Sequence, residues 1–111
     1  MAILSSHTLN GTDGTHAGGI GLTLTNLNTG EVVFRGQMDD GGRLTQKISD
    51  EEIDTKATFE LVFDTAAYWN SRNITSTITQ IALRFKMPNS AGAYHMPIIL
   101  NPNSYSTWCS A

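Results

Sequence analysis

The chain has 111 residues, a length that fits one domain with a sizeable hydrophobic core and is too short for two. Apolar residues make up 40% of the chain and charged residues 15%, a balance typical of a globular protein rather than a disordered one. The net charge is −3 and the seven lysines and arginines are scattered, which argues against a nucleic-acid-binding protein.

Three further features concern disulfides, secretion and membranes. Cys109 is the single cysteine, so the chain cannot form an intramolecular disulfide. The first apolar residues are followed at once by Ser5, Ser6 and His7, which does not fit a signal peptide. No apolar stretch is long enough to cross a membrane. We therefore expect residues 1–111 to form a single soluble domain in the cytoplasm.

Alternating apolar and polar residues predict a chain rich in half-buried strands. The clearest case is residues 21–27, which a turn at 28–30 joins to a second strand at 31–37, giving a hairpin. The run Asp39-Asp-Gly-Gly42 predicts a sharp turn after this hairpin. Further strands are predicted at residues 44–48, 57–63, 74–87, 94–100 and 105–109.

One short helix is predicted over residues 64–72, where Asp64 or Thr65 can cap the first turn and two alanines follow. The acidic segment 49–54 lacks an apolar period and is predicted to be a loop. The glycine-rich run 18–21 lacks the strand–turn–helix context of a nucleotide-binding loop, so it predicts a bend before a strand. Seven or eight strands with one short helix predict an antiparallel β-sandwich.

The three histidines are the first candidates for chemistry, because imidazole changes charge near neutral pH. His7, His16 and His95 are too far apart for a local metal-binding motif, and one cysteine cannot complete a structural zinc site. No metal site is therefore predicted. A shared catalytic site remains open, and so does the simpler interpretation of three surface or hydrogen-bonded core histidines.

Four segments occur in an order and at a spacing that resemble a known family. They are Ser5-Ser-His-Thr-Leu9, Asp39-Asp-Gly-Gly-Arg43, Leu61-Val-Phe-Asp-Thr-Ala-Ala-Tyr-Trp69, and Tyr94-His-Met-Pro-Ile-Ile-Leu-Asn-Pro with Tyr105-Ser-Thr. Each segment alone is a weak signal. Together, in a chain of this length, they resemble the 5-hydroxyisourate hydrolase branch of the transthyretin family from about residue 4 to residue 110.

This resemblance implies an all-β, transthyretin-like antiparallel sandwich of two four-stranded sheets with one short helix. It also implies a homotetramer built as a dimer of dimers, with small-molecule substrate clefts where the dimers meet and the C-terminal segment along them. The implied activity is that of an enzyme of purine breakdown, which hydrolyses the ring of 5-hydroxyisourate, the unstable product of urate oxidation. The family requires no cofactor.

The resemblance carries over His7, Arg43 and His95 as the catalytic set. One histidine would act as the base on an attacking water, and the other would polarise or protonate the substrate. The arginine would hold the urate-like ring and stabilise developing negative charge. His16 has no counterpart in this set and is expected on a loop surface.

The end of the chain departs from the family pattern. The family typically ends in Tyr-Arg-Gly-Ser, where this chain has Trp108, Cys109, Ser110 and Ala111. The first three are the predicted substrate-binding residues. The change removes the positive charge of the family's arginine, and no arginine follows Arg84 that could replace it. Two alternatives therefore stay open: a relative acting on another cyclic molecule as a hydrolase, isomerase or cyclase, for example in natural-product biosynthesis, and a non-enzymatic carrier of small ligands.

Overall fold

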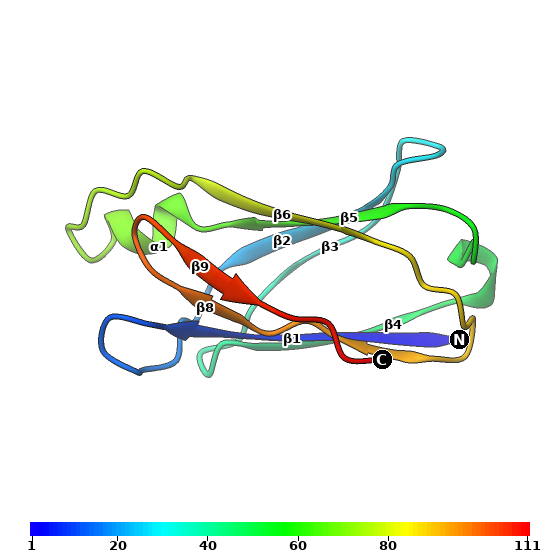
Figure 1. The fold of residues 1–111 in the computed structure, drawn as a ribbon, viewed down its shortest axis with the longest axis horizontal. Coiled ribbons are helices and arrows are strands. Elements are labelled where there is room, and N and C mark those ends of the chain that lie inside the picture. The colour runs from blue at the N-terminus through cyan, green and yellow to red at the C-terminus, as the bar shows by residue number, and fades with distance from the viewer.

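The computed structural model describes all residues from Met1 to Ala111 as two β-sheets packed face to face, with a short helix at one end (Figure 1). The first sheet has the order β4-β1-β8-β9 with β7 also paired to β1, and the second has the order β3-β2-β5-β6. The elements in chain order are β1 (Ala2–Asn10), β2 (Gly21–Asn26), β3 (Glu31–Gln37), β4 (Arg43–Ile48), η1 (Asp50–Glu52), β5 (Phe59–Asp64), α1 (Ala66–Asn70), β6 (Gln80–Phe85), β7 (Ala93–His95), β8 (Ile98–Leu100) and β9 (Tyr105–Thr107).

The predicted β-sandwich with one short helix is confirmed, and so is the hairpin, in which β2 and β3 pair antiparallel. The predicted strands at 44–48 and 57–63 are found as β4 and β5 within a few residues. Most strand pairs are antiparallel as expected, but β1 pairs in parallel with both β7 and β8. The first sheet is therefore mixed.

β1, for which no strand is predicted from the sequence, is the longest strand and lies inside the first sheet. Its core-facing side begins with apolar Ala2 and Leu4 but continues with Ser6, Thr8 and Asn10, so the apolar alternation fades. The fold accepts these buried polar groups because each one is hydrogen-bonded. Their partners are the Met96 carbonyl for Ser6 Oγ, the Ala17 carbonyl for Thr8 Oγ1 and Tyr68 Oη for Asn10 Nδ2.

The predicted strand at 94–100 is interrupted at Pro97 and forms two short strands, β7 and β8. Proline has no N–H to donate to a neighbouring strand, so the ladder cannot continue through this residue. β7 pairs with residues 3–5 of β1 and β8 pairs with residues 8–10. The first sheet therefore has five strands in four positions, where four strands were expected.

Three other elements differ from the prediction. The strand predicted at 74–87 is limited to β6, because the N–H groups of Thr77 and Ile78 bond to the Pro102 carbonyl instead of a neighbouring strand. The helix spans only Ala66–Asn70, and Thr65 occupies its N-cap position without a side-chain capping bond. The predicted loop at 49–54 contains the single 3₁₀ turn η1.

The core lies between the two sheets and determines which side chains point outward. Its largest fully buried apolar side chains include Leu4, Leu24, Phe59, Phe63 and Trp69. Burying each such side chain stabilises the fold by about 1.5–3 kcal/mol, so the register of the strands is firmly held. The residues of β1 between its buried positions therefore face away from the core. The structure contains no helix long and apolar enough to span a membrane.

Candidate active site

The outward face of the first sheet brings His7 and Arg43 together from adjacent strands. His7 lies on β1 between the buried Ser6 and Thr8, and its side chain is on the face away from the core. Arg43 is the first residue of β4 and is the direct antiparallel partner of His7. Directly opposed residues in such a pair have Cβ atoms about 5 Å apart, so these side chains share one patch of surface.

A tight turn holds Arg43 in this place. Gly42 has a positive φ of 71°, and a Cβ atom at this position would collide with the carbonyl oxygen of Thr8. The carboxylate of Asp39 accepts a hydrogen bond from the backbone N–H of Arg43 at 2.9 Å. The sequence run Asp39-Asp-Gly-Gly-Arg43 thus closes against β1 and starts β4 at the residue that faces His7.

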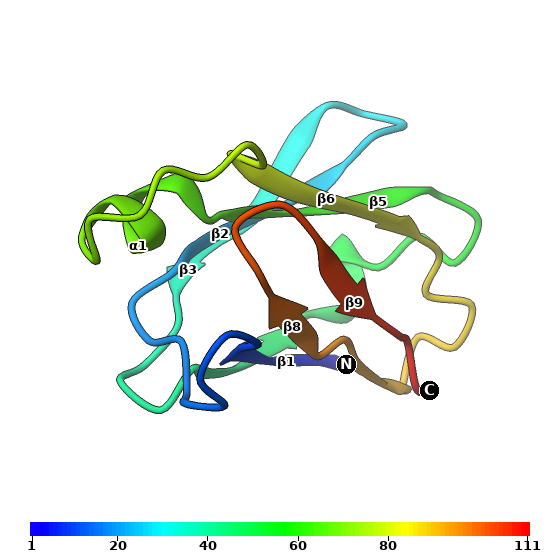
Figure 2. The ribbon, with the colours of Figure 1, turned by 60° about the vertical axis from the view of Figure 1, so that its left-hand side comes forward.

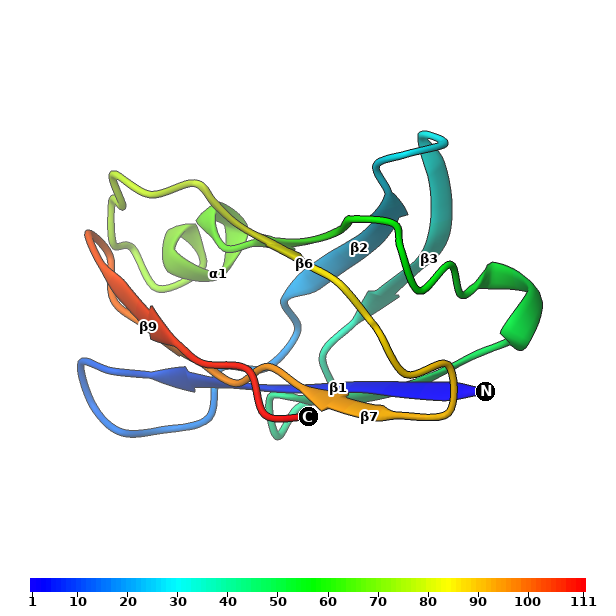
Figure 3. The same cartoon turned by 45° about the vertical axis from the view of Figure 1, so that its right-hand side comes forward.

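His95 reaches the same face from the other side of β1. It ends β7, which runs along β1 (Figure 3), and is the parallel partner of Ser5, two residues before His7. A hydrogen bond of 2.8 Å joins His95 Nδ1 to Ser5 Oγ. This bond orients the ring and leaves His95 Nε2 without a partner in the chain, as the proton-accepting nitrogen of a base must be.

The loop between β1 and β2 places His16 against His7. The Ala17 N–H bonds to the Thr8 carbonyl and the Asn10 N–H bonds to the Thr15 carbonyl, so the loop folds back along β1. His16 Nδ1 lies 2.9 Å from His7 Nε2, and the two ring centroids are 5.0 Å apart. The expected loop position of His16 is confirmed, but no sequence pattern indicates its contact with His7.

Burial and the positive charges around His7 lower its pKa from the ordinary value of 6.5. Burial is the largest cause, followed by the positive charge of Arg43 and then by His16 and His95, while the Gly41 carbonyl acts in the opposite direction. Arg43, His16 and His95 are therefore all close enough to His7 to affect its charge. His7 is therefore neutral at neutral pH.

The three predicted substrate-binding residues divide between two places. Ser110 lies beside His95, because the two residues exchange backbone hydrogen bonds of 2.9 and 3.0 Å. Trp108, which is 53% exposed, and Cys109 instead line a largely apolar hollow of about 240 Å³ with β6, Met96 and Thr107. We call the region around this hollow, between β6 and the C-terminal segment, the seam. Figure 2 shows β6 and β9 at neighbouring edges of the two sheets. Substrate binding by all three stays a prediction.

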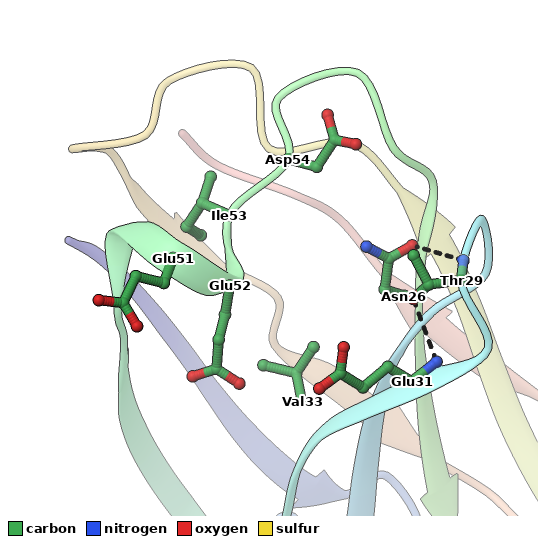
Figure 4. Close-up of a pocket in the computed structure, with 8 residues that line it drawn as sticks. All are labelled: Asn26, Thr29, Glu31, Val33, Glu51, Glu52, Ile53 and Asp54. Carbon is green, nitrogen blue, oxygen red and sulfur yellow. Dashed lines mark hydrogen bonds between the residues drawn. The ribbon is translucent and has the colours of Figure 1, made fainter.

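Other hollows lie away from the histidines. One of about 420 Å³, near the β2–β3 turn and η1, is ringed by the carboxylates of Glu31, Glu51, Glu52 and Asp54 (Figure 4). No group of three or more histidine, cysteine, aspartate or glutamate side chains is placed to hold a metal ion. The histidine face remains the part of the surface where groups suited to acid–base chemistry converge.

Two further residues of this face are not indicated by any sequence motif. Ser5 is 90 residues from His95 in the chain, and its bond to His95 depends on the parallel pairing of β1 and β7. The contact of His16 with His7 depends on how the loop that carries His16 folds back. A strand prediction at residues 2–10 would have put Ser5 and His7 on one face, since residues two apart in a strand point the same way.

Comparison with known proteins settles the family. The model of the HIUase/Transthyretin family matches residues 4–109. The chain belongs to this family. It is 32% identical to a protein of Caenorhabditis elegans named probable 5-hydroxyisourate hydrolase, over 96% of this chain and 79% of the relative.

Two solved structures share the fold. The 5-hydroxyisourate hydrolase of Klebsiella pneumoniae superimposes with a TM-score of 0.84 at 23% identity, covering all of both chains. The transthyretin of the fish Sparus aurata superimposes with a TM-score of 0.86 at 25% identity, covering 96% of this chain and 95% of the other. The HIUase/Transthyretin fold therefore accounts for the whole chain, and the choice between hydrolase and carrier depends on side chains.

Proposed function

We propose that this member of the HIUase/Transthyretin family is a hydrolase that opens the ring of 5-hydroxyisourate. The observation that carries the proposal is the register of the first sheet, which puts His7 opposite Arg43 and His95 on the next strand, all on one outward face. The match to a relative named as such a hydrolase supports the substrate. A carrier of apolar ligands has no need of this set, so the geometry favours catalysis.

His95 is the proposed base. Its Nδ1 is held by Ser5 Oγ at 2.8 Å, and with the proton on Nδ1 the Nε2 lone pair can accept a proton from water. The water oxygen then forms a bond to a ring carbonyl carbon while His95 takes the proton. When the ring C–N bond breaks, His95 returns this proton to the leaving nitrogen. The reaction consumes one water and needs no cofactor.

Arg43 and His7 are the proposed stabilisers of the transition state. The guanidinium of Arg43 offers a planar set of donors for oxygens of a urate-like ring and for the charge that develops on the attacked carbonyl. His7, neutral because its pKa is lowered, would polarise the carbonyl as an N–H donor without adding a second full charge beside Arg43. This division of roles is part of the proposal.

The proposal includes an assembly. Ser5, His7 and His95 lie on an outward sheet face instead of in a deep cleft of one chain, so a second copy is needed to enclose the substrate. We expect the homotetramer implied by the family, acting on a small molecule in the cytoplasm. Ser110, through its backbone contact with His95, is the part of the C-terminal segment best placed to touch the substrate.

The test is a direct assay. Purified protein is added to urate freshly oxidised by urate oxidase, and the decay of the 5-hydroxyisourate ultraviolet absorbance is followed against buffer and against a His95→Ala variant. Faster decay with the parent protein and not with the variant supports the proposal. A decay equal to that of buffer, with a folded parent protein, would reject it.

A second candidate keeps the histidine site but changes the substrate to another cyclic molecule. The observation that favours it is the C-terminal segment, where Cys109 and Trp108 line an apolar hollow and no residue supplies the family's arginine. A Cys109→Arg variant tests it in the same assay. An inactive parent and an active variant would mean that the missing charge alone limits the reaction. If both are inactive, the site serves another substrate.

A further inference from the structure

The outward face of the first sheet carries fixed charges of one sign. The outward positions of β4 include Arg43 and Lys47, which lie opposite His7 and Ile3 of β1. No aspartate or glutamate occupies an outward position on any strand of this sheet, from β4 through β1 to β7, β8 and β9. The whole chain has a net charge of −3, so this cationic face contrasts with the rest of the molecule.

The carboxylates of the chain lie elsewhere. Four of them ring the hollow near the β2–β3 turn and η1. The carboxylate of Asp39, in the turn before β4, accepts the backbone N–H of Arg43. The side chains of Arg43 and Lys47 form no salt bridge with any carboxylate of the chain. Both charges on this face are therefore left without a partner of opposite sign.

Arg43 and Lys47 are close enough to act together on one small anion. They are four residues apart along β4, which corresponds to about 13 Å at about 3.3 Å per residue. Thr45 is the outward residue between them and lies opposite Ser5, which bonds to His95. A small anion over Thr45 lies within about one Debye length, or about 8 Å, of both charges at physiological ionic strength. It also lies on the row of the sheet that leads to His95.

We infer that this face selects an anionic ring, and that Lys47 is a specificity-determining residue that draws the anion toward Arg43 and the histidines. The ligand class is a cyclic imide or ureide in its ionised form, because an N–H between two carbonyl groups releases its proton more readily than an ordinary amide. This inference rests on the proposed function, since it describes how the same site captures its substrate. Lys47 acts through its charge and takes no part in the chemical step.

Two features of the proposed site favour this role for Lys47. The C-terminal segment lacks the family's arginine, so the fixed positive charge at the site comes from β4. The proposed assembly also brings a second copy over the face, and like charges that meet across an interface repel each other. An anionic ligand between the copies offsets this repulsion, whereas a neutral ligand does not.

The experiment compares Lys47→Gln with Arg35→Gln in the full-length protein. Arg35 is exposed and lies opposite Thr23 on the outer face of the second sheet, so both variants lose one positive charge, but from opposite faces. Binding of urate, a stable anionic ring, is followed by NMR through the histidine ring signals at low and high salt. In the same buffers kcat and kcat/KM are measured with 5-hydroxyisourate, and size-exclusion chromatography verifies that all variants form the same assembly.

We expect Lys47→Gln to weaken urate binding and to lower kcat/KM about two- to threefold at low salt, because one unit charge at about 8 Å in water contributes about that factor. The value of kcat should not change. Lys47→Glu reverses the charge and should lower both quantities about fivefold. Arg35→Gln should stay near the parent protein. At about 1 M salt the differences should disappear, because the Debye length is then only about 3 Å.

The outcomes separate this inference from the proposed function. If urate leaves the histidine signals of the parent protein unchanged, or if Lys47→Gln binds urate as the parent protein or Arg35→Gln does, the role of Lys47 is wrong, whatever the activity. If urate binding depends on Lys47 and on salt as expected but no protein hydrolyses 5-hydroxyisourate, the anion-selecting face stands and the proposed substrate fails.

Discussion

The outward face of the first sheet and the seam between β6 and the C-terminal segment contrast in chemistry and in how they are built. The face carries His7, Arg43 and His95. The register of the strands places Arg43 opposite His7 and His95 opposite Ser5, two residues before His7. The seam is a largely apolar hollow bordered by Trp108 and Cys109, formed where edges of different sheets meet. Register fixes side chains in pairs, whereas the seam depends on a short terminal segment. If the proposed function is correct, changes on the face should affect catalysis more than changes at the seam.

Among changes on the outward face and at the seam, removal of the proposed base should lower the hydrolytic activity most. We expect His95→Ala to lower kcat/KM about 10²–10⁴-fold, because proton transfer by a positioned side chain contributes that much. The half-buried side chain leaves the fold intact, which circular dichroism and thermal unfolding should verify. A folded variant with parent-like activity would remove His95 from the mechanism.

Arg43 should follow in size. Arg43→Gln removes the positive charge, and we expect kcat to fall about 10²–10³-fold, the range seen when one donor to a developing oxyanion is lost. Arg43→Lys should recover only part of the rate, since an ammonium lacks the planar pair of donors. Because Arg43 lowers the pKa of His7, the pKa of His7 should also rise in the glutamine variant, which NMR can measure.

The pH dependence sharpens the role of His7. Burial and the charge of Arg43 lower the pKa of His7 from 6.5, so His7 gains its proton at a lower pH than an ordinary histidine does. If neutral His7 is required, kcat/KM should fall on its account by about tenfold per pH unit only below that lowered pKa. A profile of kcat/KM from about pH 5 to about pH 8 measures this.

Ser5 should have a smaller effect. Ser5→Ala removes the 2.8 Å bond to His95 Nδ1 and leaves the ring free to turn, and we expect about a tenfold loss of kcat for about 1.4 kcal/mol of lost orientation. Ser5→Thr keeps the hydroxyl and should retain most of the activity. Equal losses in both variants would mean that packing, rather than the hydrogen bond, positions His95.

The seam should give the smallest effect. Cys109→Ser changes an exposed residue, so the free energy of unfolding should change by less than about 0.5 kcal/mol, measured by urea denaturation. If the face alone binds substrate, KM should also stay at the parent value. A clear rise in KM would instead make the seam part of the substrate site and support the predicted role of Cys109.

Much of the sandwich could be predicted because its strands carry local signals. The hairpin of β2 and β3 alternates apolar and polar residues around a glycine-containing turn, and the Asp39–Gly42 turn is explicit. β1 could not be predicted in this way, because three of its five core-facing residues are polar and their burial is compensated by hydrogen bonds to other segments of the chain. The break at Pro97 was visible in the sequence, but the apolar run on both sides of it hid the two separate strands.

The sequence by itself determined the family, the class of fold and the candidates His7, Arg43 and His95. The family and the candidates follow from motifs in a fixed order, and the class of fold follows from strand periodicity; both are local patterns that can be recognised without the structure. Only the tertiary structure decided which groups touch them. Parallel pairing of β1 with β7 brings Ser5 to His95, and the return of a loop brings His16 to His7. The same folding placed Trp108 and Cys109 at the seam and Ser110 beside His95. Contacts of this kind depend on register and loop path, which no local pattern records.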